Sequence, residues 1–138
     1  MIPDNHVYLA QALFDSDRKQ AAENVYRNAA RQFSNSEFVQ FAAGEYYYNE
    51  KNYATAVRYL LTAITIKKDS ARSQLGLALS LFELNQPIPA LEHFDAACKL
   101  DKTRAAYNEL RAASSRLRKI EQQKIASQYD TKVLNCLK

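Results

Sequence analysis

The chain has 138 residues, of which 47% are hydrophobic and 25% are charged, a balance typical of a globular domain or a short repeat array rather than a disordered chain. Its 2 glycines and 3 prolines are too few for the many turns of a sandwich, a barrel or a glycine-rich nucleotide-binding fold. The net charge is +4, and no apolar run approaches the ~20 residues that cross a bilayer.

Small residues recur every 34 positions along the first hundred residues. Three such columns are present: Ala10, Gly44 and Ala78; Ala22, Ala56 and Ala90; and Ala29, Ala63 and Ala97. Two columns of mostly larger residues have the same period: Leu13, Tyr47 and Leu81; and Tyr26, Leu60 and Phe94. Small side chains at fixed places let two helices approach closely, and large ones fill the space between them. A repeated pair of packed helices is therefore predicted.

The breaks between helices follow the same period. Residues 15–17, 49–52 and 85–89 carry Asp, Asn, Ser or Pro and divide each repeat in two. Side chains that can cap the start of a helix stand between repeats, at Asn35 and Ser36, at Asp69 and Ser70, and at Asp101. The sequence thus predicts three helix–turn–helix units, at residues 3–36, 37–70 and 71–104.

A further helix is predicted after the third unit, beginning near Lys102 or Thr103. One apolar stripe marks it, formed by Ala106, Leu110, Ala113, Leu117 and Ile120. No pattern for a partner helix follows, so we interpret residues 105–125 as a single helix. Residues 126–138 are interpreted as a flexible tail, in which a short docking turn could form.

The 34-residue helix–turn–helix with small residues in these columns resembles the tetratricopeptide repeat (TPR) family. The resemblance implies an all-α, right-handed α-solenoid that is closed by the helix at 105–125. The sequence departs from the family pattern at Gln40 and Gln74, where the family often has Trp. Because the fold does not fix the function, the resemblance implies only the general role of a protein–protein interaction module.

In TPR arrays the first helix of each pair lines a concave groove. By this resemblance the groove would be lined mainly by apolar and aromatic residues, which suit a partner helix or an extended segment. The candidate groove residues are Val7, Gln11, Phe14, Phe38, Phe41, Glu45, Tyr48, Arg72, Leu75, Leu79 and Phe82. Alternatively, these side chains pack against neighbouring helices, or the tail fills the groove.

Several kinds of partner are compatible with such a groove. The main hypothesis is a scaffold or adaptor, and the second is a small chaperone that resembles the TPR chaperones of type III secretion. A carboxylate clamp for heat-shock chaperone tails is not expected, because the positions that would carry its basic and Asn side chains are occupied by Val7, Gln11, Gly76, Ala106 and Leu110. Self-association is a further alternative, as a homo-oligomer or within a larger assembly.

The positive charge is concentrated at the C-terminal end. Residues 1–100 contain 10 Lys and Arg against 11 Asp and Glu, whereas residues 101–138 contain 9 against 4. Arg104, Arg111 and Arg118 are spaced seven apart and form a candidate basic face. Contact with nucleic acid or an anionic surface is therefore an alternative function. Glu109 and Glu121 interrupt this face, and no aromatic ladder accompanies it.

No catalytic or cofactor motif is apparent. His6 and His93 are far apart and lack the neighbouring ligands that a metal needs, and two glycines cannot form a phosphate-binding loop. We therefore expect no enzyme activity, no metal and no cofactor. Cys98 and Cys136 are predicted to be free thiols, and with no signal-peptide pattern at the N-terminus they suggest a reducing, cytoplasmic location.

Overall fold

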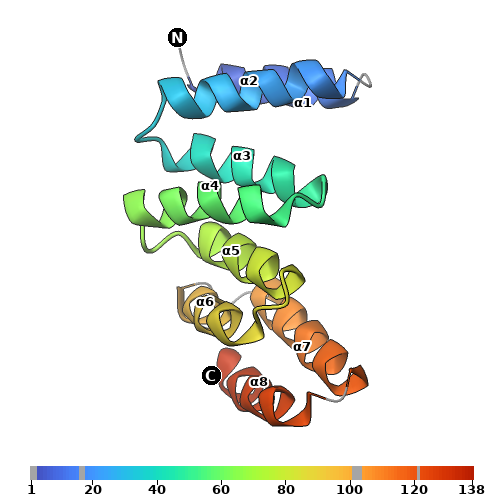
Figure 1. Cartoon of the computed structure of the whole chain (residues 1–138). Coiled ribbons are helices and arrows are strands. Elements are labelled where there is room, and N and C mark those ends of the chain that lie inside the picture. The colour runs from blue at the N-terminus through green and yellow to red at the C-terminus, as the bar shows by residue number, and fades with distance from the viewer. Residues whose placement is uncertain (1–2, 16–17, 101–103, 121) are drawn as a thin grey trace. The chain divides into compact units, whose positions relative to one another are not determined.

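The computed structural model of the chain describes residues 3–15, 18–100, 104–120 and 122–138. Over these residues the regular elements are all α-helices, as Figure 1 shows. The chain divides into two compact units, residues 1–68 and residues 69–138, which we call the N-terminal and C-terminal units. The N-terminal unit contains α1 (Pro3–Asp15), α2 (Lys19–Gln32), α3 (Glu37–Asn49) and α4 (Tyr53–Ile66), and the C-terminal unit contains α5 (Ala71–Glu83), α6 (Pro87–Leu100), α7 (Arg104–Lys119) and α8 (Gln123–Cys136).

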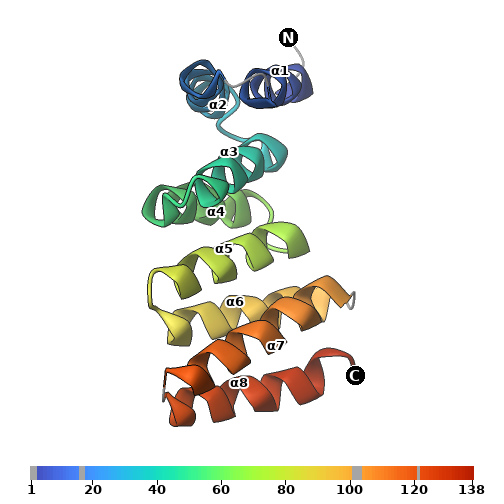
Figure 2. The same cartoon turned by 90° about the vertical axis from the view of Figure 1, so that its right-hand side faces the viewer.

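Consecutive helices pack as pairs within each unit. The pairs are α1 with α2, α3 with α4, α5 with α6, and α7 with α8, and Figure 2 shows each as a helical hairpin. The three small-residue columns lie inside these pairs, because all nine of their members are buried. The small residues that recur every 34 positions therefore lie where the two helices of a pair pack together.

Among the described residues, side-chain caps are present at the start of three helices. The Ser36 hydroxyl accepts a hydrogen bond from the Val39 amide, and the Ser70 hydroxyl accepts one from the Ser73 amide. Asn52 caps α4 in the same way, and Pro87 lies in the first turn of α6. Asp101, Lys102 and Thr103, where a cap and a helix start were predicted, lie outside the described residues.

The two glutamines that depart from the family pattern have structural roles. Gln40 is buried in α3, and its side-chain amide donates to the Ala30 carbonyl at the end of α2, at 2.8 Å. Gln74 is buried in α5, and its side-chain oxygen lies 2.8 Å from Nδ1 of His93 in α6. Each buried glutamine therefore pairs with a polar group on a neighbouring helix.

At Gly44, α3 and α4 approach each other closely. A Cβ placed on Gly44 would lie 2.6 Å from Cγ of Leu60, a side chain that is itself 1% exposed. Alanine favours a helix over glycine by about 1 kcal/mol, whereas overpacking a core costs about 1–3 kcal/mol. We expect Gly44→Ala to lower the free energy of unfolding by about 1 kcal/mol in chemical denaturation. The loss should shrink in a Leu60→Val background, and an unchanged loss there would contradict this explanation.

The C-terminal end differs from its sequence prediction. Residues 126–138 were expected to form a flexible tail, but most of them belong to α8, in which Ala126, Tyr129 and Cys136 are buried. The helix predicted at 105–125 is likewise two helices, since α7 ends at Lys119 and α8 begins at Gln123. The tail prediction is wrong because α8 packs against α6 and α7 and gains its core there.

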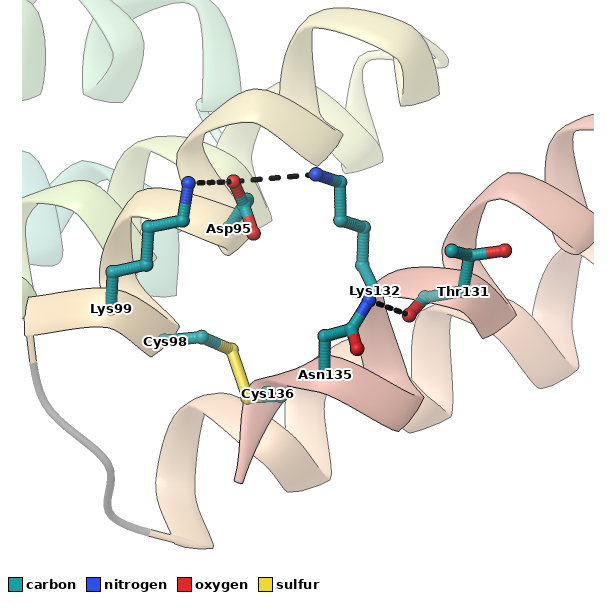
Figure 3. Close-up of a disulfide and its surroundings, with 7 residues drawn as sticks. All are labelled: Asp95, Cys98, Lys99, Thr131, Lys132, Asn135 and Cys136. Carbon is teal, nitrogen blue, oxygen red and sulfur yellow. Dashed lines mark hydrogen bonds and ion pairs between the residues drawn. A yellow bond between two sulfur atoms is a disulfide. The ribbon is translucent and has the colours of Figure 1, made fainter. Parts of the chain in front are cut away.

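The prediction of two free thiols is also wrong. Cys98 of α6 and Cys136 of α8 form a disulfide, with their Cα atoms 5.2 Å apart. Figure 3 shows the bond beside Asp95, whose carboxylate pairs with Lys99 of its own helix and with Lys132 of α8. The packing of α8 on α6 brings the two cysteines together across 38 residues of sequence. Since disulfides persist in oxidising compartments, the cysteines no longer support a reducing location.

Candidate interaction surfaces

The first candidate surface lies on the first helices of the N-terminal unit, which pack against each other. The residues predicted there share one side of each helix through their spacing of three or four positions. We call this set the α1/α3 face: Val7, Gln11 and Phe14 of α1, and Phe38, Phe41, Glu45 and Tyr48 of α3. None of the seven is fully buried.

The large side chains of the α1/α3 face are half-buried rather than free. The ring of Phe14 packs edge-on against that of Tyr46, with centroids 5.9 Å apart. The ammonium of Lys19 lies 5.6 Å from the centroid of the Phe14 ring. Tyr48 packs in the same manner against Tyr53. The face therefore combines anchored rings with partly accessible apolar surface. Packing against neighbouring helices accounts for part of it, and its role as a binding groove stays a prediction.

The second candidate surface lies on α5 in the C-terminal unit. We call it the α5 face, and it consists of Arg72, Leu75, Leu79 and Phe82. Arg72 is exposed and the three apolar residues are half-buried. The ring of Phe82 packs against those of Phe94 and Tyr129 and lies 4.9 Å from the Arg116 guanidinium.

A small cavity of about 150 Å³ adjoins Phe82. Its apolar lining comes from Phe82, Pro87, Leu117 and Ile120. Arg116 and Glu83 stand at the same cavity and form an ion pair with each other. A cavity of this size accommodates one apolar side chain or a benzene-sized group.

The candidate basic face is only partly available. Arg104, Arg111 and Arg118 are all exposed on α7. Arg118, however, pairs with Asp130 of α8 and also donates to Ser114, and Arg104 lies over the ring of Tyr107 at 5.5 Å. Internal pairing therefore reduces the positive charge that this face presents to a phosphate backbone.

The sequence did not predict a larger pocket in the N-terminal unit. It has a volume of about 450 Å³ and lies between α2 and α4, with Tyr47 of α3 contributing to its lining. Its charged residues are Glu23, Arg27, Arg31 and Arg58. The available signal was the presence of arginines on the second helix of two consecutive repeats, but their convergence depends on how the two helices pack.

Each of the two histidines contacts a neighbouring side chain. His6 packs against Phe33, His93 is engaged with Gln74, and burial lowers the pKa of His93. No group of three or more potential metal ligands is formed by the described residues. None of the described helices is both long enough and apolar enough to cross a membrane.

The repeat at the centre of the chain matches a known family. Residues 39–70 match the model of the tetratricopeptide repeat. This segment covers α4 and most of α3, the pair whose sequence is closest to the family pattern. No curated protein sequence matches the chain.

Several solved structures are similar to most of the chain. PilF of Pseudomonas aeruginosa is 24% identical with a TM-score of 0.74, over 97% of this chain and 60% of PilF. The first TPR of Spaghetti (RPAP3), bound to the HSP90 peptide SRMEEVD, is 16% identical with a TM-score of 0.75, over 84% of this chain and 93% of that one. The type III secretion translocator chaperone SycD of Yersinia enterocolitica is 17% identical with a TM-score of 0.69, over 88% of this chain and 93% of that one.

These matches agree with the helical pairs and with the buried small-residue columns described above. The predicted all-α fold of the TPR solenoid class is confirmed. Residues 39–70 therefore match the tetratricopeptide repeat, and the remaining described helices share the fold of solved tetratricopeptide-repeat structures.

Proposed function

We propose that the chain is a non-enzymatic protein–protein interaction module that binds an apolar helix or extended segment of a partner. The observation that carries the proposal is the partial exposure of large apolar side chains at helical spacing, such as Phe38 and Phe41 on α3 and Leu75 and Leu79 on α5. Each of these pairs suits the apolar side of a partner helix, whose anchors recur every three or four residues.

The cavity beside Phe82 supports the same proposal. At about 150 Å³ it has room for one apolar side chain of a partner, and Arg116 and Glu83 at its edge could orient the partner's backbone or a polar neighbour. Buried anchors of this type supply most of the affinity in many protein interfaces.

The structural relatives support the choice of protein as the partner. The Spaghetti TPR was solved with an HSP90 peptide, and SycD is a secretion chaperone. A peptide that binds to this chain should differ in chemistry from the HSP90 tail, because Val7, Gln11 and Gly76 occupy the positions of the polar side chains expected in a carboxylate clamp. The likeness to SycD favours the chaperone as the second candidate function.

Charged substitutions on the two faces test the proposal. We expect Phe41→Glu and Leu79→Glu each to remove a partner that the wild-type chain captures from its native source, because each places a carboxylate in an apolar contact. Recovery would be quantified by mass spectrometry. The matched control is Leu61→Glu on α4, since Leu61 is 45% exposed and belongs to neither face.

Three further comparisons decide the outcome. Circular dichroism should show unchanged helicity for every variant, and Phe41→Ala and Leu79→Ala provide milder substitutions if a charged variant unfolds. Equal recovery by wild type and both face variants would contradict the proposal. Aggregation of the captured partner in the absence of this chain would favour a chaperone, whereas a partner that is stable alone would favour a scaffold.

A further inference from the structure

The pocket between α2 and α4 has the charge of an anion site. Arg27 and Arg31 are one helical turn apart on α2, and Arg58 projects from the facing side of α4. All three are exposed residues that line the same hollow of about 450 Å³. This volume lies within the range of about 300–1,000 Å³ that is typical of ligand sites.

Aromatic residues support one side of the pocket. Tyr47 is 6% exposed, and its ring is stacked on that of Tyr59 with centroids 5.5 Å apart and planes within 3° of parallel. The Tyr47 hydroxyl donates to the carboxylate of Glu23 at 3.3 Å. This side of the pocket is therefore fixed by packing, and its single carboxylate already has a partner.

The positive charge of the pocket is not neutralised internally. Three guanidinium groups stand against the one carboxylate of Glu23. Among the described residues, no ion pair involves Arg27, Arg31 or Arg58. Other arginines of the chain do have acidic partners, since Arg116 pairs with Glu83 and Arg118 pairs with Asp130. An excess of positive charge in one pocket favours an anionic ligand.

We propose that this arginine pocket binds an acidic, extended segment of a partner protein, in which carboxylates alternate with other residues. The spacing favours a peptide over a nucleotide. Arg27 and Arg31 are four residues apart, a rise of about 6 Å along a helix. Side chains two residues apart on an extended chain are separated by about 6.6 Å. Alternate Asp or Glu side chains can therefore each bind one guanidinium, whereas the phosphates of a nucleotide share a bridging oxygen and lie closer together than one helical turn.

The site is independent of the proposed apolar faces. None of the residues that line the arginine pocket belongs to the α1/α3 face or the α5 face. Binding of an acidic segment here can therefore be measured whether or not the apolar faces bind a partner.

Fluorescence anisotropy on the full chain tests the proposal with defined probes. The probe is a fluorescein-labelled peptide of four Glu-Ser repeats, and a Gln-Ser peptide of the same length is its neutral control. We expect the acidic peptide to bind and the neutral peptide not to bind. Arg27→Gln and Arg58→Gln should each weaken binding about tenfold, the effect of losing one charge-assisted hydrogen bond.

The control variant is Lys124→Gln, which removes one exposed charge from α8 in the C-terminal unit, outside the candidate basic face. It should leave the affinity for the acidic peptide unchanged. Absence of peptide binding at millimolar concentration would overturn the proposal. An equal loss in Lys124→Gln would also overturn it, because it would indicate a general charge effect. So would displacement of the peptide by ATP at lower concentrations than by unlabelled peptide, because it would indicate a nucleotide site.

Discussion

Reduction of the Cys98–Cys136 disulfide should lower the free energy of unfolding of the C-terminal unit by about 3–4 kcal/mol, the chain-entropy effect of releasing a loop of this size. The bond spans 38 residues and joins α6 to α8, so it closes a loop that contains all of α7. Chemical denaturation with and without dithiothreitol measures the effect. Because repeat proteins can unfold in parts, the hydrogen-exchange rates of the α8 amides should be measured alongside the denaturation curves.

The Cys98→Ser, Cys136→Ser double variant is the control for this experiment. Its stability should match that of the reduced wild type and should not respond to dithiothreitol. Thiol titration of the unreduced, denatured wild type should find no free cysteine, since both cysteines are in the bond. Two titratable thiols before reduction, or identical denaturation curves for the oxidised and reduced chains, would contradict the account.

Truncation of Tyr129 should have a comparable effect. Tyr129 is fully buried in α8, and its ring lies 6.0 Å from that of Phe82 and 5.9 Å from that of Phe94. Its hydroxyl donates to the Pro87 carbonyl at 2.6 Å. We expect Tyr129→Ala to cost about 3–5 kcal/mol, because it leaves a cavity where α5, α6 and α8 meet.

Tyr129→Phe distinguishes the contribution of the ring to stability from that of the hydroxyl. It keeps the aromatic packing and removes only the hydrogen bond to Pro87, so a loss of about 1 kcal/mol is expected. Urea denaturation of both variants under oxidising conditions keeps the disulfide constant. If Tyr129→Ala cost no more than Tyr129→Phe, the ring would not be part of the core.

The sequence was sufficient to predict the helical pairs through residue 100. Columns such as Ala22, Ala56 and Ala90 identify the sites of closest helix contact, because only a small side chain fits there. Caps such as Ser36 and Ser70 mark helix starts through short-range chemistry. These features are local and periodic, so no knowledge of tertiary structure is needed to find them.

The sequence did not predict the pair formed by α7 and α8, because this pair departs from the 34-residue period. The buried small residues Ala113 and Ala126 lie 35 and 36 positions after Ala78 and Ala90, rather than 34. Its core also depends on Tyr129, a lone aromatic residue in a largely polar segment. The sequence of α8 is polar on average, and its burial comes from packing against α6 and α7.

The disulfide and the arginine pocket are likewise tertiary features. Cys98 and Cys136 become neighbours only once α8 packs on α6. Arg27 and Arg58 line one pocket because α2 and α4 face each other, with Tyr47 between them. In contrast, the candidate residues of the α1/α3 and α5 faces were chosen from periodicity and family resemblance, and their role in binding remains a prediction.

Site-specific photo-crosslinking tests the central proposal of partner binding most directly. Benzoylphenylalanine would replace Phe41 on α3, Leu79 on α5 or, as a control, Leu61 on α4, and each chain would be irradiated with its native-source extract. Adducts to one and the same protein from positions 41 and 79, and none from position 61, are the predicted result. Adducts from position 61 alone would contradict the account and would move partner binding away from the apolar faces of the first helices.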